Sequence, residues 1–122
     1  MRSLINDLMK GYYMPHIRMR AIETEQAAKI SQVLLKELSA ATKAAEENFT
    51  FELIETTFFA DGKKTRSYPF IEVYWFDRPQ EMQDQCAKII TNRVKEIANP
   101  EDVIVVFNKL SKTDYYENGS HF

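Results

Sequence analysis

Two adjacent residues, Met14 and Pro15, suggest acid–base chemistry that depends on where translation begins. If Met14 is the start, removal of the initiator methionine leaves Pro15 as a free secondary amine at the head of a strand. A chain-terminal amine titrates near pH ~7.7 to 8.0, and an apolar pocket close to cations lowers its pKa further, toward a general base at neutral pH. Within a longer chain the same nitrogen is an amide and has no basicity.

The segment ahead of this proline, residues 1–13, matches nothing in the rest of the chain. Lys10 and Gly11 must be encoded by AAA or AAG followed by GGN, a purine run that resembles a ribosome-binding sequence two codons upstream of the Met14 codon. One interpretation is therefore that translation starts at Met14. The alternative is a genuine short N-terminal helix, because apolar residues recur in the segment at helical spacing. The intact mass of protein from its native source distinguishes the two, since Met1 is present only in the second case.

The elements that would position Pro15 come from a duplication. The segment MPHIRMRAIE, from Met14, aligns with YPFIEVYWFD, from Tyr68, at an offset of 54. Both are typical of strands, with proline at the first position, alternating residues and a final acidic residue suited to the start of a helix. The segment from Phe49 aligns with that from Val103 at the same offset, and each alternates as a strand. The element order is therefore β-α-β-β-α-β.

An amphipathic helix is expected between the strands of each copy. The first runs from about Thr24 to Ala45, and the second opens near Pro79, which fits a first helical turn. AAKI in the first helix aligns with CAKI in the second at an offset of 59, five more than for the strands. The predicted apolar faces consist of Ala27, Ile30, Leu34, Leu38 and Ala41 in the first helix and Met82, Cys86, Ile89, Val94 and Ile97 in the second.

The pattern predicts an α+β fold in which a tandem β-α-β repeat forms a four-stranded sheet with two helices on one face. A turn at Asp61-Gly62 would join residues 50–60 antiparallel to 65–76. A ferredoxin-like split β-α-β sheet has the same element order, and the order of strands separates the two folds. The residues expected to face the helices are Ile17, Met19, Phe51, Leu53, Ile71, Val73, Trp75, Val103, Val105 and Phe107.

The opposite face of the predicted sheet mixes apolar residues with charges of both signs, which suits burial against other subunits, so we expect a homo-oligomer. The alternative is a partly apolar solvent face on a monomer. The predicted organisation is an extension, 1–13, and one domain, 14–122. The domain comprises a first unit, 14–60, a second unit, 65–110, and a polar C-terminal tail, 111–122, that we expect to assist assembly.

Composition argues against several classes of protein. Lysine and arginine total 16 against 18 acidic residues, so no nucleic-acid partner is expected. There is no apolar run of roughly 18 residues and no signal peptide, which predicts a cytoplasmic protein that does not engage a membrane. The single cysteine, Cys86, cannot form an internal disulfide and should face the core. His16 and His121 lack metal-ligand spacing and no phosphate-binding glycine motif is present, so neither metal nor cofactor is expected.

The MPHI string at the head of a strand, the duplicated unit and the length from Met14 resemble the tautomerase superfamily, which includes macrophage migration inhibitory factor and the oxalocrotonate tautomerases. The strings ELIETTFF, YPFIEVYWFD and YYENGSHF are similar to a small uncharacterised bacterial family within it. The resemblance covers residues 14–122. It implies a homotrimer with sites between subunits and an amino-terminal proline, here Pro15, as the general base.

Characterised tautomerases add cationic or polar side chains that bind a carboxylate and polarise the carbonyl being enolised. The present sequence departs from that pattern, with Thr50 where some relatives place arginine and Ile104 and Val106 at last-strand positions that are polar in the inhibitory-factor group. The residues that could substitute are Arg18, Arg20, Tyr74 and Lys109.

Each substitute also has a structural interpretation. Arg18 and Arg20 could pair with Glu52 and Glu72 on the same face of the sheet, Tyr74 could be an interface aromatic, and Lys109 a solvated strand end. Two functions follow. The first is a tautomerase-like isomerase of a small keto acid with Pro15 as base. The alternative is a non-enzymatic oligomer that binds a small molecule or a protein.

Overall fold

The computed structural model describes residues 14–121; both interpretations of the extension, 1–13, fall outside the described residues, as does Phe122. The main sheet has four strands, in the order β2-β1-β5-β6. They are β1 (His16–Arg20), β2 (Thr50–Leu53), β5 (Phe70–Phe76) and β6 (Ile104–Leu110). β1 lies parallel to β2, β5 parallel to β6, and β1 antiparallel to β5. The two strands of each copy are therefore adjacent and parallel, which confirms the tautomerase-like arrangement over the ferredoxin-like one.

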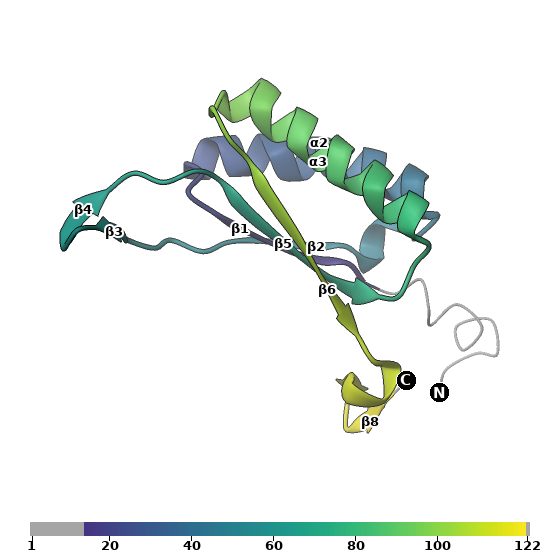
Figure 1. Cartoon of the computed structure of the whole chain (residues 1–122). Helices are drawn as coiled ribbons and strands as arrows, with labels where there is room; N and C mark the ends of the chain where they lie inside the picture. Colours follow the sequence, from purple (N-terminus) through teal and green to yellow (C-terminus); the bar gives the residue numbers. More distant parts are fainter. Residues whose placement is uncertain (1–13, 122) are drawn as a thin grey trace.

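Both helices cover the same face of this sheet (Figure 1). They are α2 (Thr24–Thr42) and α3 (Gln80–Ala98). Each ends at a residue in the left-handed conformation, Lys43 or Asn99, whose backbone N–H returns to a carbonyl of the last turn. The first helix therefore stops three residues before the predicted Ala45. The side chain of Arg93 in α3 ties the helices together through Glu37 in α2.

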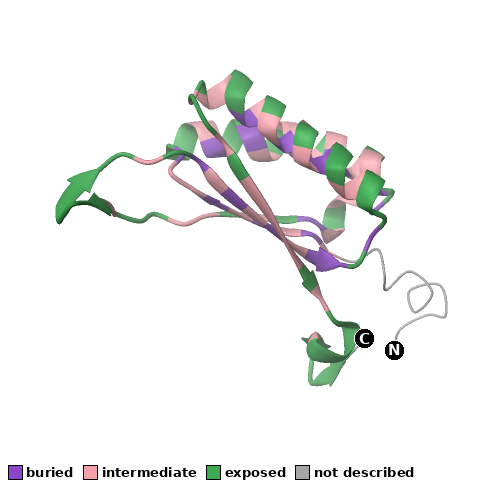
Figure 2. Cartoon of the chain, in the orientation of Figure 1, coloured by how far each residue is buried: buried purple, intermediate pink, exposed green. Residues whose placement is uncertain are grey.

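The core lies between the helices and the sheet, as Figure 2 shows. All ten strand residues predicted to face the helices are buried or packed against the core. Ile17 and Ile71, on the two central strands, are 0% exposed. Alternation in a strand sends successive side chains to opposite faces, so His16, Arg18 and Arg20 of β1 share the face away from the helices. The face of the sheet away from the helices therefore carries the polar and charged side chains of β1.

The buried faces of the two helices correspond at an offset of 56, not at the predicted 59. Cys86, Ile90 and Val94 of α3 each follow their buried counterpart in α2 by 56 positions. The AAKI and CAKI strings gave the wrong offset because their alignment differs from the alignment of the buried faces by three residues, about one helical turn. As a result Ile90 is fully buried, whereas the predicted Ile89 only packs at the edge of the core.

We expect Ile90→Val to destabilise the protein by about 1 kcal/mol, the typical effect of deleting one buried methyl group, and Ile89→Val to have a smaller effect. The two substitutions remove the same group from neighbouring positions, so each is the control for the other. Urea unfolding followed by circular dichroism measures the difference. Equal losses of stability would contradict the offset of 56.

The Asp61-Gly62 turn does not join the two copies within the main sheet as predicted. It closes a separate two-stranded hairpin, β3 (Phe58–Ala60) with β4 (Lys63–Thr65). The antiparallel partner of β5 is β1. The reason is geometric: β1 lies between β2 and β5, so a tight turn cannot make those two strands neighbours. The chain instead leaves the sheet, forms the hairpin and returns (Figure 1).

Shorter segments complete the described part of the chain. A 3-10 turn, η2 (Glu46–Asn48), leads into β2, and another, η3 (Lys112–Asp114), follows β6. The tail then forms a small hairpin of β7 (Tyr116–Glu117) and β8 (Ser120–His121). Among residues 14–121, neither helix combines the length and apolarity that crossing a membrane requires.

Candidate active site

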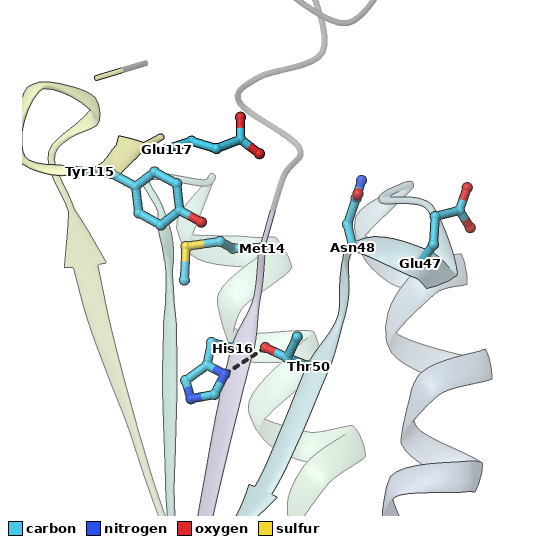
Figure 3. A pocket seen from close by; sticks show the side chains of 7 residues that line it. All are labelled: Met14, His16, Glu47, Asn48, Thr50, Tyr115 and Glu117. Atoms are coloured by element: carbon cyan, nitrogen blue, oxygen red, sulfur yellow. Dashed lines mark hydrogen bonds between the residues drawn. The ribbon is translucent and has the colours of Figure 1, made fainter. Parts of the chain in front are cut away.

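A cavity of about 480 Å³ opens at the head of β1 (Figure 3). Three parts of the chain line it: the start of β1, the η2–β2 junction and the segment after β6. Its lining residues are Met14, His16, Glu47, Asn48, Thr50, Tyr115 and Glu117. A second hollow of about 310 Å³ shares Met14 and His16 and continues along the sheet to Arg18, Glu52, Tyr74 and Leu110.

Pro15 is buried beside this cavity, and its carbonyl accepts a hydrogen bond of 3.2 Å from the backbone N–H of Thr50. Met14, which is bonded to the Pro15 nitrogen, lines the cavity, and its side chain points toward Tyr115 in Figure 3. The backbone of Met14 has a φ of 65°, in the left-handed region that a methionine rarely occupies. Met14 therefore occupies space that adjoins the proline nitrogen, in a strained conformation.

Arg78 provides a buried cation at this junction, which was not predicted from the sequence. Its residue is 7% exposed, and its guanidinium donates to the carbonyl of Met14 at 3.3 Å and to that of Phe76 at 3.2 Å. It also lies 4.8 Å from the ring centroid of Trp75, a cation–π contact. Standard C=O and C–N bond lengths of roughly 1.2 and 1.3 Å place it within about 6 Å of the Pro15 nitrogen. Both strand-to-helix connections are three residues long, 21–23 and 77–79, so the predicted difference of five residues is wrong and no length difference pointed to Arg78.

On the face of the sheet away from the helices, His16 connects the cavity to a polar network. Its Nδ1 lies 2.5 Å from the hydroxyl of Thr50, and its Nε2 lies 3.0 Å from a carboxylate oxygen of Glu52. Because an ionised carboxylate only accepts, Nε2 donates to it, and the hydroxyl of Thr50 is the hydrogen-bond partner of Nδ1. His16 is therefore not the isolated polar residue that was expected, and its position two residues before Arg18 on the same face of β1 was a usable signal.

The network continues through both predicted arginines. Arg18 donates to Glu52 at 2.8 Å and to the phenol oxygen of Tyr74 at 3.4 Å, and Tyr74 donates to Glu72 at 3.2 Å. Arg20 is ion-paired with Glu72. The structure thus brings three of the four predicted substrate-binding residues together, already in contact with carboxylates of the chain. The fourth, Lys109, instead forms an exposed ion pair of 3.4 Å with Asp77 and lines neither of the two cavities.

The hydrogen bond from His16, followed by the neighbouring positive charges, holds the pKa of Glu52 below its usual range. A lowered pKa in the folded state stabilises the fold above the unfolded pKa, and that contribution is lost as the pH falls through the folded value. We expect His16→Ala to raise the pKa of Glu52, measured by carboxyl NMR titration. Arg20→Ala, which removes a cation of the same face that does not contact Glu52, is the control and should shift it less.

Burial raises the pKa of the Cys86 thiol to about 11, with Arg78 opposing part of the effect. This thiol is buried, as predicted, and stays protonated at neutral pH. Within residues 14–121 no group of three or more histidine, cysteine, aspartate or glutamate side chains is arranged to hold a metal ion.

The fold and the position of the strand-opening proline define a protein with the architecture of the tautomerase superfamily. The family model described as a domain of unknown function, DUF1904, matches residues 14–121, and the chain belongs to that family. No curated protein matches it.

Solved structures agree with both assignments. A protein of unknown function from Vibrio cholerae is 39% identical over 100% of each chain, with a TM-score of 0.86. A DUF1904 domain from Sebaldella termitidis is 45% identical over 89% of this chain and 100% of its own, with a TM-score of 0.83. A macrophage migration inhibitory factor-like protein from Entamoeba histolytica shares the fold at 16% identity, covering 90% of this chain and 100% of its own, with a TM-score of 0.72.

Proposed function

We propose that this chain acts as a tautomerase-like isomerase in which Pro15, as a free amino-terminal amine, interconverts the keto and enol forms of a small keto acid. The proline nitrogen takes a proton from the carbon next to the ketone, so a C–H bond breaks and an N–H bond forms. The same proton is then returned to the enolate oxygen or to another carbon. Arg78 supplies a buried positive charge that favours the uncharged amine and the negative enolate.

One observation carries this proposal: Met14 lies in the cavity and is bonded to the Pro15 nitrogen. Removing Met14 would expose a secondary amine to the cavity. Removing Met14 would also relieve the backbone strain of its left-handed conformation, which further supports the proposal. Support also comes from Pt0534, a protein with this fold at 12% identity and a TM-score of 0.72, which was inactivated by 2-oxo-3-pentynoate, an electrophilic 2-oxo acid.

The composition of one face of the sheet supports self-association. The sheet face away from the helices carries the ion-paired network together with half-buried or exposed apolar residues such as Phe70 and Ile104. A face of this kind is suited to burial between subunits. A fused 4-OT that shares the fold at 17% identity is a trimer. We therefore propose a homotrimer with this face directed inward.

The test compares two chains, one beginning at Pro15 and one at Met1. NMR follows solvent deuterium exchange at the carbon next to the ketone of a 2-oxo acid. A positioned base typically contributes about 10²- to 10⁴-fold, so the shorter chain should exchange deuterium faster by that factor. Pro15→Ala in the shorter chain should lower the rate. Equal rates for both chains, at the rate of buffer alone, would remove the proposal.

A second candidate, a non-enzymatic oligomer that binds a ligand between subunits, is favoured by a separate observation. Arg18, Arg20 and Tyr74 are already engaged with Glu52 and Glu72, which competes with binding a substrate carboxylate. A retained Met1 in the native protein would select this candidate, because the nitrogen of Pro15 would then be an amide.

A further inference from the structure

The hairpin of β3 and β4 extends away from the end of the sheet, as Figures 1 and 2 show. Residues 59–66 are all exposed, and Phe59 is 65% exposed. An isolated two-stranded hairpin is marginally stable in water at best. Among residues 14–121, Phe59 is the most exposed of the large hydrophobic side chains, so its ring is available for contact with another surface. We refer to residues 58–66 as the basic arm.

The charge of the arm indicates what kind of surface it fits. It carries Lys63, Lys64 and Arg66 against the single carboxylate of Asp61, although the whole chain has a net charge of −2. Within the described residues 14–121, none of these three cations forms a salt bridge. An acidic surface with room for an aromatic ring would be complementary both to the positive charge of the arm and to the exposed ring of Phe59.

The cavity beside Pro15 has such a surface. Two exposed carboxylates, Glu47 and Glu117, line it, and Tyr115 and Met14 add apolar surface. We call Glu47 and Glu117 the acidic rim. Because β1 and β2 are parallel, the cavity lies where they begin and the arm leaves where β2 ends. At about 3.3 Å per residue, the five residues of β1 separate the two by roughly 17 Å, and the arm points outward. An arm therefore cannot reach the cavity of its own chain.

We propose that the basic arm of one copy docks on the acidic rim of a second copy, with Phe59 over the cavity and Lys64, its cross-strand partner on the same face of the hairpin, beside Glu47 and Glu117. Each active-site cavity is then completed by a neighbouring subunit. The docked arm limits solvent access to Pro15 and brings positive charge to a rim that carries two carboxylates. This inference rests on the proposed self-association but not on the proposed chemistry of Pro15.

The first test is a disulfide between copies. The double variant Glu47→Cys/Lys64→Cys, oxidised at low protein concentration, should give covalent dimers and larger species on a non-reducing gel. The control Glu47→Cys/Lys88→Cys pairs the rim with an exposed position on α3 and should stay monomeric on the gel. The native Cys86 is buried and does not compete. A disulfide within one chain, or equal cross-linking of the control, would overturn the docking.

The second test reverses charges and then restores them. Lys64→Glu should weaken the association by about tenfold or more, measured by sedimentation, because like charges then meet at the interface. Lys63→Glu, on the opposite face of the hairpin, is the control and should weaken it less. Adding Glu47→Lys/Glu117→Lys to Lys64→Glu should restore the association. Full association of the Lys64→Glu variant, or no recovery in the variant that combines it with the two rim substitutions, overturns arm docking and leaves self-association standing. A wild-type chain that sediments as a monomer overturns both, and neither result bears on the deuterium exchange of Pro15.

Discussion

A chain that begins at Pro15 should be modified at its amino terminus by 2-oxo-3-pentynoate. The uncharged secondary amine adds to the alkyne carbon conjugated with the ketone, so that an N–C bond forms and one π bond of the alkyne breaks. The proton lost by nitrogen moves to the neighbouring carbon, and the protein gains the full mass of the reagent. A lowered pKa keeps the amine uncharged near pH 7, so modification should be complete at one reagent molecule per chain. Intact mass followed by peptide mapping measures it.

The chain that begins at Met1 is the matched control. It has the same fold and carries an ordinary primary amine at its end, while Pro15 is an amide without a lone pair available for addition. We expect no modification of residues 14–121 in this chain. Cys86, a competing nucleophile by residue type, is 1% exposed and stays protonated. Modification of a lysine in both chains at equal rates would show that the cavity confers no reactivity on Pro15.

The strands and their buried faces could be predicted because alternation is a local property of the chain. Ile17, Met19, Ile71, Val73 and Trp75 face the helices as their parity requires. The duplication added the order of elements, and the resemblance of MPHI and the longer strings to known tautomerases selected the sheet topology. The helix register was predicted less well, because an amphipathic helix returns to the same face after either three or four residues, so matching strings one turn apart look equivalent.

Residues of the candidate site could be predicted only where strand alternation determines which face of the sheet they occupy. Arg18, Arg20 and Tyr74 gather on one sheet face because strand neighbours in register place them there. Arg78 could not be found in this way. Its position beside Met14 follows from the antiparallel pairing of β1 with β5, which brings the end of one strand to the beginning of the other. A contact between residues 64 positions apart is set by tertiary structure, and no spacing within a single element indicates it.

That contact leads to a prediction about the acidity of the Pro15 amine. A cation within about 4 to 6 Å favours the uncharged form of an amine and lowers its pKa, typically by about one to three units. Arg78 therefore acts in this direction, while Glu47 and Glu117 on the cavity rim act in the opposite one. Because Arg78 is buried, and the carbonyl of Phe76 and the ring of Trp75 still hold it when Met14 is absent, we expect its effect to prevail over that of the two exposed carboxylates.

In the chain that begins at Pro15, Arg78→Gln should raise the pKa of the amine by about one unit, which reduces the uncharged fraction roughly tenfold at pH values below both pKa values. Labelling by 2-oxo-3-pentynoate should then slow about tenfold at pH 6 and be nearly unchanged at pH 10, where the amine is uncharged in both proteins. Arg78→Lys keeps the charge and should stay close to the parent, whereas a purely structural role would make both variants slow at every pH. A ¹⁵N NMR titration of Pro15 gives the pKa directly, and an unchanged value in Arg78→Gln would show that the guanidinium anchors the strand ends without tuning the amine.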